Sequence, residues 1–123
     1  MSTTASSIGP AQKPGGMVAP KEQVPTAYAL ESNYPNPFNP STKIDYSLPE
    51  GGMVSFRIYD VLGREIETLV DSYQKEGQYT VTWNSTQNSK VPVSSGVYFA
   101  RLRVLDGIGG VKFTKTIRLL LVK

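Results

Sequence analysis

The chain has 123 residues, of which 39% are apolar and 19% are charged, and it contains no cysteine and no histidine. The missing cysteine excludes a disulfide framework, a thiolate nucleophile and a cysteine-ligated metal site. The missing histidine excludes a Ser-His-Asp triad and the usual general base near neutral pH. We therefore expect a protein that is not an enzyme and that uses no cofactor or metal.

The net charge of +3 is unevenly distributed along the chain. Residues 29–95 carry five basic and eight acidic side chains, a sum of −3, whereas residues 96–123 carry six basic side chains and one acidic one, a sum of +5. Such a mild net charge does not predict nucleic-acid binding, which needs a dense basic face. The sequence contains no run of about twenty apolar residues, so it predicts no membrane-spanning helix.

The first predicted element, residues 1–28, is a linker or disordered tail. It holds four of the nine prolines and three glycines, and it shows no apolar periodicity. Such a segment buries too little surface to offset the entropy of ordering it. Its first ten residues also lack the apolar stretch of a secretory signal. We therefore expect either a cytoplasmic protein or one whose export signal lies upstream of this sequence.

Residues 29–123 are predicted to form one domain built of strands. Apolar and polar residues alternate there with a period of two, which is typical of strands with one buried face. The expected strands lie around residues 29–33, 43–48, 54–58, 65–70, 79–83, 96–105 and 111–122. Turn residues predict hairpins at 49–52, 60–63 and 106–110, and polar stretches predict connections between two sheets at 71–77 and 84–95.

Short strands separated by turns, with no helical window, predict an all-β fold, an immunoglobulin-like antiparallel β-sandwich of about seven strands. Because no disulfide can join the two sheets, apolar and aromatic side chains have to fill the core. The predicted core residues are Phe56, Ile58, Tyr79, Val81 and Trp83. We expect Tyr98 to act as a corner tyrosine whose hydroxyl group bonds to the backbone.

A proline-rich segment precedes the second predicted strand. Its three prolines fix three φ angles, remove three backbone donors and push the preceding residues into extended geometry, which predicts a rigid corner. The corner comprises Pro35, Asn36, Pro37, Phe38, Asn39 and Pro40, and Phe38 is expected to plug the open end of the sandwich. A recognition element is the alternative interpretation.

Four carboxylates, those of Asp60, Glu65, Glu67 and Asp71, offer two further kinds of site. A calcium site is one, but the segment lacks the alternating Asp/Asn ligands and the closing Glu of a dedicated calcium loop. A glycosidase pair is the other, but any β-sandwich offers several acidic pairs by chance. Neither pattern is specific.

The sequence ends on an apolar strand, IRLLLVK at residues 117–123. A strand this long and apolar has to pair with a neighbour, because otherwise it would promote aggregation. It is either an ordinary last strand or a strand that another protein recognises, by edge pairing or by gripping the terminus.

Five motifs occur in register along the sequence. They are YPNPFNPST at residues 34–42, IYDVLGREI at 58–66, GQYTVTW at 77–83, SGVYFARL at 95–102 and a leucine-rich ending on Lys123. In this order and spacing, residues 29–123 resemble the C-terminal sorting domain (type A) of the type IX secretion system of Bacteroidetes and related phyla. The middle portion also resembles the immunoglobulin-like domain of flagellar hook-capping proteins.

The resemblance implies a delivery function. Sorting domains follow a linker at the end of a secreted passenger domain, fold in the periplasm and are recognised by the outer-membrane secretion machinery. A sortase-like protease removes many of them and attaches the passenger to surface lipopolysaccharide, so the passenger ends at the cell surface or outside the cell. The cleavage region would lie within residues 1–28.

In that family, the recognition information concentrates in the last two strands. The residues implied here are Gly96, Tyr98, Arg101, Arg103, Lys115, Arg118, Leu119, Leu121 and Lys123. The segment with a charge of +5 is the same region, which fits an electrostatic role in docking to a partner.

Two other functions stay open from the sequence. Trp83 and the loop 84–95 look more like the hook-capping domain, which favours a non-catalytic structural module that self-associates or pairs with a partner domain through edge strands. A carbohydrate-binding sandwich would need exposed coplanar aromatics, for which the candidates are Tyr28, Tyr34 and Tyr73. The lysine that follows an apolar terminal strand favours the sorting domain.

Overall fold

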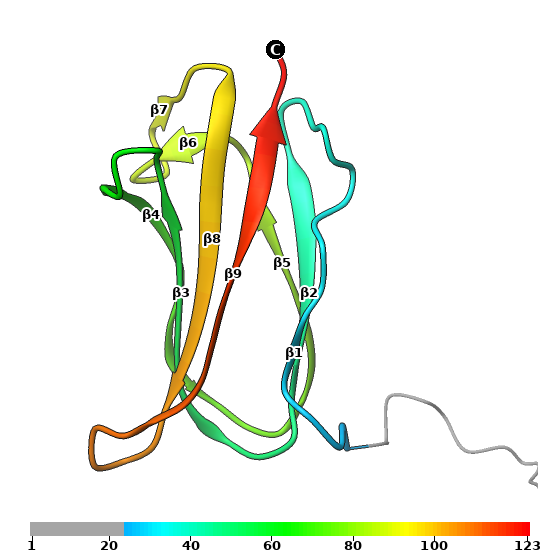
Figure 1. Cartoon of the computed structure of the whole chain (residues 1–123), viewed down its shortest axis with the longest axis vertical. Helices are drawn as coiled ribbons and strands as arrows, with labels where there is room; N and C mark the ends of the chain where they lie inside the picture. The colour runs from blue at the N-terminus through cyan, green and yellow to red at the C-terminus, as the bar shows by residue number, and fades with distance from the viewer. Residues whose placement is uncertain (1–23) are drawn as a thin grey trace, which may run out of the picture.

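The structure, a computed structural model, describes residues 24–123 (Figure 1). Most of the predicted linker, and with it most of the predicted cleavage region, lies outside the described residues. The first strand begins at Ala29, and the preceding residue, Tyr28, stacks on Phe113 with ring centroids 5.2 Å apart. The sandwich therefore includes at least one residue of the segment predicted to be a linker.

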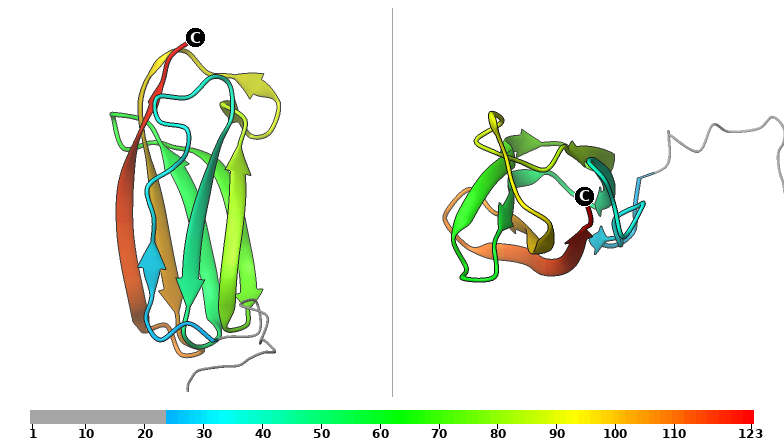
Figure 2. Two further views of the ribbon diagram at one scale, coloured as in Figure 1. Left: turned by 90° about the vertical axis from the view of Figure 1, so that its right-hand side faces the viewer. Right: turned by 90° about the horizontal axis from the view of Figure 1, so that it is seen from above.

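Nine strands make up the fold, and no helix is present among residues 24–123. They are β1 (Ala29–Leu30), β2 (Thr42–Leu48), β3 (Gly52–Tyr59), β4 (Glu65–Gln74), β5 (Gly77–Trp83), β6 (Thr86–Gln87), β7 (Val91–Pro92), β8 (Gly96–Leu105) and β9 (Val111–Leu121). One sheet has the order β1-β2-β5, the other has the order β4-β3-β8-β9, and β6 pairs with β7 alone. The two larger sheets face each other (Figures 1 and 2). The prediction of an all-β sandwich is confirmed.

Two predicted connections were wrong in part. The turn at 49–52 is not a hairpin, because β2 belongs to the three-stranded sheet and β3 to the four-stranded one. Turn residues reverse the chain in either case and do not specify which sheet the next strand joins. Residues 71–77 do cross between the sheets, but most of them are not a loop, since β4 continues to Gln74 and its polar side chains face solvent.

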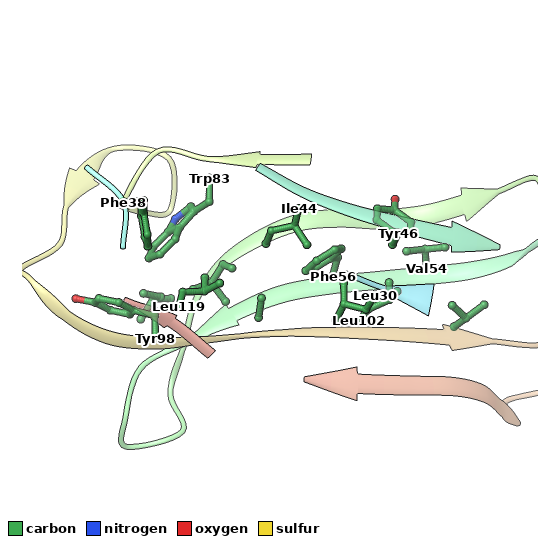
Figure 3. Packing of buried hydrophobic residues seen from close by; sticks show 14 of the residues in the cluster. Leu30, Phe38, Ile44, Tyr46, Val54, Phe56, Trp83, Tyr98, Leu102 and Leu119 are labelled. Carbon is green, nitrogen blue, oxygen red and sulfur yellow. The ribbon is translucent and has the colours of Figure 1, made fainter. Parts of the chain in front are cut away.

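The core lies between the two sheets and follows the alternation of the strands (Figure 3). Of the predicted core residues, Phe56, Ile58 and Trp83 are buried. Tyr79 and Val81 pack against the core but stay partly exposed, because β5 is an edge strand of its sheet. Edge strands have a neighbour on one side only, so their inner side chains are less well covered.

Aromatic contacts hold one end of the core together. The ring of Trp83 lies 5.7 Å from that of Phe38 and 5.2 Å from that of Tyr98, measured between centroids. Figure 3 shows these three side chains gathered near Leu119, at the end of the sandwich where β9 finishes. The last strand thus contributes directly to the aromatic cluster.

Candidate functional site

Within residues 24–123, the hairpin of β8 and β9 has the longest strand pairing, from Gly96 opposite Leu121 to Leu105 opposite Val111. Asp106 closes the turn, because its carboxylate accepts hydrogen bonds from the N–H groups of Ile108 (2.9 Å) and Gly110 (2.7 Å). These two bonds lower the pKa of Asp106 below its ordinary value of 3.8. The turn thus fixes the register, and the register decides which face each side chain occupies.

Three of the predicted recognition residues lie on the inner face of this hairpin. Tyr98, Leu119 and Leu121 are 7%, 0% and 1% exposed. The hydroxyl of Tyr98 donates to the backbone oxygen of Ser94 at 2.6 Å, which is the geometry of a tyrosine corner. In the folded chain these three side chains support the fold and are not available to a partner.

Three arginines lie on the outer face of the same hairpin. Arg118 of β9 is opposite Phe99, while Arg101 and Arg103 of β8 are opposite threonines of β9. Arg101 is held in place, because its Nη2 donates to the hydroxyl of Tyr59 at 2.7 Å and its Cζ lies 4.7 Å from the centroid of that ring. Arg118 is exposed, whereas Arg101 and Arg103 are half-buried.

The other three predicted residues have separate positions. Lys115 is directly opposite the buried Leu102, so it occupies a position of β9 on the inner face of the sheet, here called the inner register. Its side chain is nevertheless exposed, because β9 is an edge strand. Gly96 has a φ of 152°, which other residues rarely adopt. A Cβ atom at this position would have no atom within 4 Å, so the backbone conformation and not a lack of space favours glycine here. Lys123 is exposed, and its backbone N–H donates to the Ser95 hydroxyl at 2.9 Å.

The proline-rich corner pairs with the end of β9, which sequence reasoning missed (Figure 2). The N–H of Phe38 donates to the oxygen of Leu120, and the N–H of Val122 donates to the oxygen of Phe38, both at 3.0 Å. The side chain of Asn36 accepts a further bond from the N–H of Leu120 at 3.2 Å. The corner therefore covers the outer edge of β9 at its end, with β8 on the other side.

Local hydrogen bonds fix the corner on the sandwich. The buried Asn33 amide donates to the Thr42 hydroxyl at 3.0 Å, and this hydroxyl donates to the Pro35 oxygen at 3.0 Å. At the other end of the corner, the Ser85 hydroxyl donates to the oxygen of Pro40. The side chain of Phe38 is 2% exposed and fills the space beside Trp83.

The four carboxylates considered for calcium or sugar cleavage have other partners. Asp60 pairs with Arg64 at 2.8 Å, and Arg57 pairs with Glu65 at 2.9 Å and with Asp71 at 3.5 Å. The buried Glu67 points away from them and accepts bonds from Ser89. No group of three or more acidic side chains suited to a metal ion occurs within residues 24–123.

The three aromatics considered for carbohydrate binding do not form one platform. Tyr28 is stacked on Phe113, whereas Tyr34 bonds to Asp45 of β2 in the three-stranded sheet. Tyr73 lies on β4, at the far edge of the other sheet. The part of the chain that the structure describes also contains no helix long and apolar enough to cross a membrane.

Comparison with protein families identifies the chain. A model of the secretion system C-terminal sorting domain matches residues 32–115, which is more than half of the sequence. The chain belongs to this family. The prediction of a type IX sorting domain from the five motifs is therefore confirmed. The sorting domain acts in general as a C-terminal sorting signal, and family membership implies export to the cell surface or secretion.

Solved structures with a similar fold include two proteins of Porphyromonas gingivalis. PorZ, described as an essential surface component of the type IX secretion system, is 23% identical with a TM-score of 0.47, and the match covers 78% of this chain and 11% of PorZ. Dimeric latent PorU is 19% identical with a TM-score of 0.58, over 79% of this chain and 10% of PorU. The chain thus spans about a tenth of the length of each protein, and it shares the fold of the matched part of PorU. No curated protein sequence matches the chain significantly.

Proposed function

We propose that the chain is the C-terminal signal by which the type IX machinery exports an upstream passenger across the outer membrane and anchors it at the cell surface. The domain is recognised in its folded form in the periplasm, and a sortase-like protease then removes it. It has no catalytic activity of its own and needs no cofactor.

The placement of β9 is the observation that carries this proposal. The strand is bonded along β8 on one side and to the corner on the other, and its apolar side chains are buried. An extended terminal peptide gripped by a receptor would require this strand to leave the core. Recognition of the folded surface, which the outer face of β8 and β9 displays, requires no such unfolding.

Self-association through edge strands is less well supported. The end of β9 is covered by the corner, and the charged Lys115 on its inner register disfavours continued pairing. The other edge of that sheet, β4, carries two irregularities in its register with β3. Bulges and inward-pointing charges are common devices that prevent strand edges from pairing with a second molecule.

A reporter fusion tests the proposal. Residues 1–123 are placed after a periplasmic reporter in a type IX-competent bacterium and in a matched strain without the secretion system, and the reporter is measured in the medium, on the surface and in the periplasm. We expect export only in the competent strain. The strain without the secretion system is the better control, because it keeps the domain intact. Deletion of residues 117–123 would instead remove core residues and unfold the domain. Periplasmic retention of a folded fusion in both strains would refute the proposal.

A further inference from the structure

Four arginines lie on the outer face of the four-stranded sheet, across three adjacent strands. Arg57 of β3 is directly opposite Arg101 of β8, with Arg103 two residues further along β8. Arg118 of β9 is opposite Phe99 and so lies diagonally from Arg101. Opposite side chains on one face have Cβ atoms about 5 Å apart, and diagonal ones about 7–8 Å apart. Together with Tyr59 and Phe99, these four residues are called the arginine face below.

The arginine face is neutralised only along one side. Arg57 has two carboxylate partners on β4, Glu65 and Asp71. Among residues 24–123, no ion pair involves Arg101, Arg103 or Arg118. Arg103 and Arg118 lie opposite uncharged side chains of the neighbouring strand. Their charges thus remain without a carboxylate partner among the described residues, and an anionic partner would complement them.

The remaining side chains of this face favour a protein as that partner. Tyr59 and Phe99 lie in one row with Arg118, next to the row that holds Arg57 and Arg101. Met53 and Tyr73 extend the same face with 42% and 62% of their surface exposed. Protein interfaces are enriched in Tyr, Phe, Met and Arg and depleted in Lys and Glu. Purely electrostatic contacts with a lipid surface need no such aromatic side chains.

A shallow groove in the arginine face could hold an acidic side chain of the partner protein. It has a volume of about 260 Å³, and its lining includes Tyr59, Phe99, Arg101 and Thr116. Since Tyr59 already orients Arg101, little side-chain freedom is lost when the guanidinium binds a carboxylate in bidentate fashion.

We propose that the arginine face is the surface by which the sorting domain docks on an acidic patch of a protein in its export machinery. This inference rests on the proposed function and adds the surface and the chemistry of the partner. It keeps three of the predicted recognition residues, Arg101, Arg103 and Arg118, and adds Arg57 of β3, which the sequence motifs did not single out for this role.

The test reverses two charges of the face in the full-chain fusion. The variant is Arg103→Glu with Arg118→Glu, and the matched control is Lys43→Glu with Lys90→Glu, two exposed lysines outside the face that give the same change in net charge. We expect the first variant to export roughly tenfold less reporter, since each lost carboxylate contact weakens docking and like charges then repel. The control should export like the wild type.

The outcomes separate the two proposals. If the wild-type fusion is not exported, the proposed function fails. If the wild type is exported and the folded Arg103→Glu/Arg118→Glu variant is exported equally well, the docking inference alone fails. Equal losses in the variant and the control would also overturn it, because net charge and not this face would then matter. Melting curves of both purified variants verify that they are folded.

A binding assay distinguishes the class of partner. The purified chain is applied to immobilised poly-glutamate and, separately, mixed with vesicles containing phosphatidylglycerol, in rising salt. We expect the wild type to elute from poly-glutamate at a higher salt concentration than the Arg103→Glu/Arg118→Glu variant. The Lys43→Glu/Lys90→Glu control should elute at the same salt concentration as the wild type. Binding to the vesicles but not to poly-glutamate would overturn the protein partner in favour of a membrane surface.

Discussion

The two faces of the C-terminal hairpin differ in what they contribute, although they belong to the same two strands. The inner face supplies buried side chains, among them Tyr98, Leu119 and Leu121. The outer face supplies guanidinium groups, those of Arg101, Arg103 and Arg118. Residues that alternate along one motif thus have separate roles, because successive side chains of a strand point to opposite faces. A family motif therefore combines residues needed for folding with residues that a partner can reach.

Removal of an inner side chain should have the largest effect on stability. Leu119→Ala is expected to lower the free energy of unfolding by about 2–5 kcal/mol, because it leaves a cavity where Leu119 is 0% exposed. The control is Leu120→Ala, the next residue on the same strand, which is 39% exposed and should cost less than about 1 kcal/mol. Urea denaturation of the purified chain measures both. Equal losses would contradict the separation of the two faces.

Loss of one inner hydrogen bond should have a smaller effect. Tyr98→Phe removes the hydroxyl that donates to the Ser94 oxygen and should lower the free energy of unfolding by about 1 kcal/mol. Tyr73→Phe is the matched control, because Tyr73 is 62% exposed and its change should be close to zero. Thermal melting of both variants is the measurement. A stability unchanged in Tyr98→Phe would mean that the corner bond contributes nothing.

Much of this arrangement can be predicted from the sequence, because it follows from local patterns. The period of two places Phe56, Ile58 and Trp83 inside, and the Asp-Gly turn at residues 106–110 joins β8 to β9. The same alternation separates Tyr98 from Arg101, although the family motif includes both. The predicted recognition set therefore divides into buried and outward-facing members.

Long-range pairing could not be predicted in this way. The corner meets β9 more than eighty residues later in the chain, and Asn36 and Leu120 show no complementary pattern in sequence. Likewise, the turn after Leu48 does not reveal that β3 joins the other sheet. Both depend on how the two sheets stack, which local turn and strand preferences do not specify. The three adjacent arginine-bearing strands become neighbours only after β3 pairs with β8.

The position of Lys115 offers a further test of the two faces, since it is a charged residue on the inner register. Lys115→Val should change the free energy of unfolding by less than about 1 kcal/mol but should promote association of the chain through the edge of β9. Thr114→Val, one residue away and opposite Arg103 on the outer face, is the control. Light scattering over a range of concentrations should show oligomers of Lys115→Val only. A monomer at all concentrations would show that the lysine does not protect this edge.

The smallest expected effect concerns the turn that joins the two strands. The bonds from the N–H groups of Ile108 and Gly110 lower the pKa of Asp106 in the folded chain below its ordinary value of 3.8. The charged carboxylate therefore stabilises the fold above about pH 4, and this contribution is lost as the pH falls through the lowered pKa. In Asp106→Asn the side-chain oxygen still accepts hydrogen bonds but does not titrate.

The melting temperature of the wild type should accordingly exceed that of Asp106→Asn at neutral pH, and the difference should shrink as the pH falls below about 4. Other carboxylates whose pKa is lowered, such as those of Asp60 and Glu65, contribute equally to both proteins and cancel in the difference. Thermal melts at several pH values provide the measurement. A difference that is constant with pH would mean that the charge of Asp106 does not stabilise the turn.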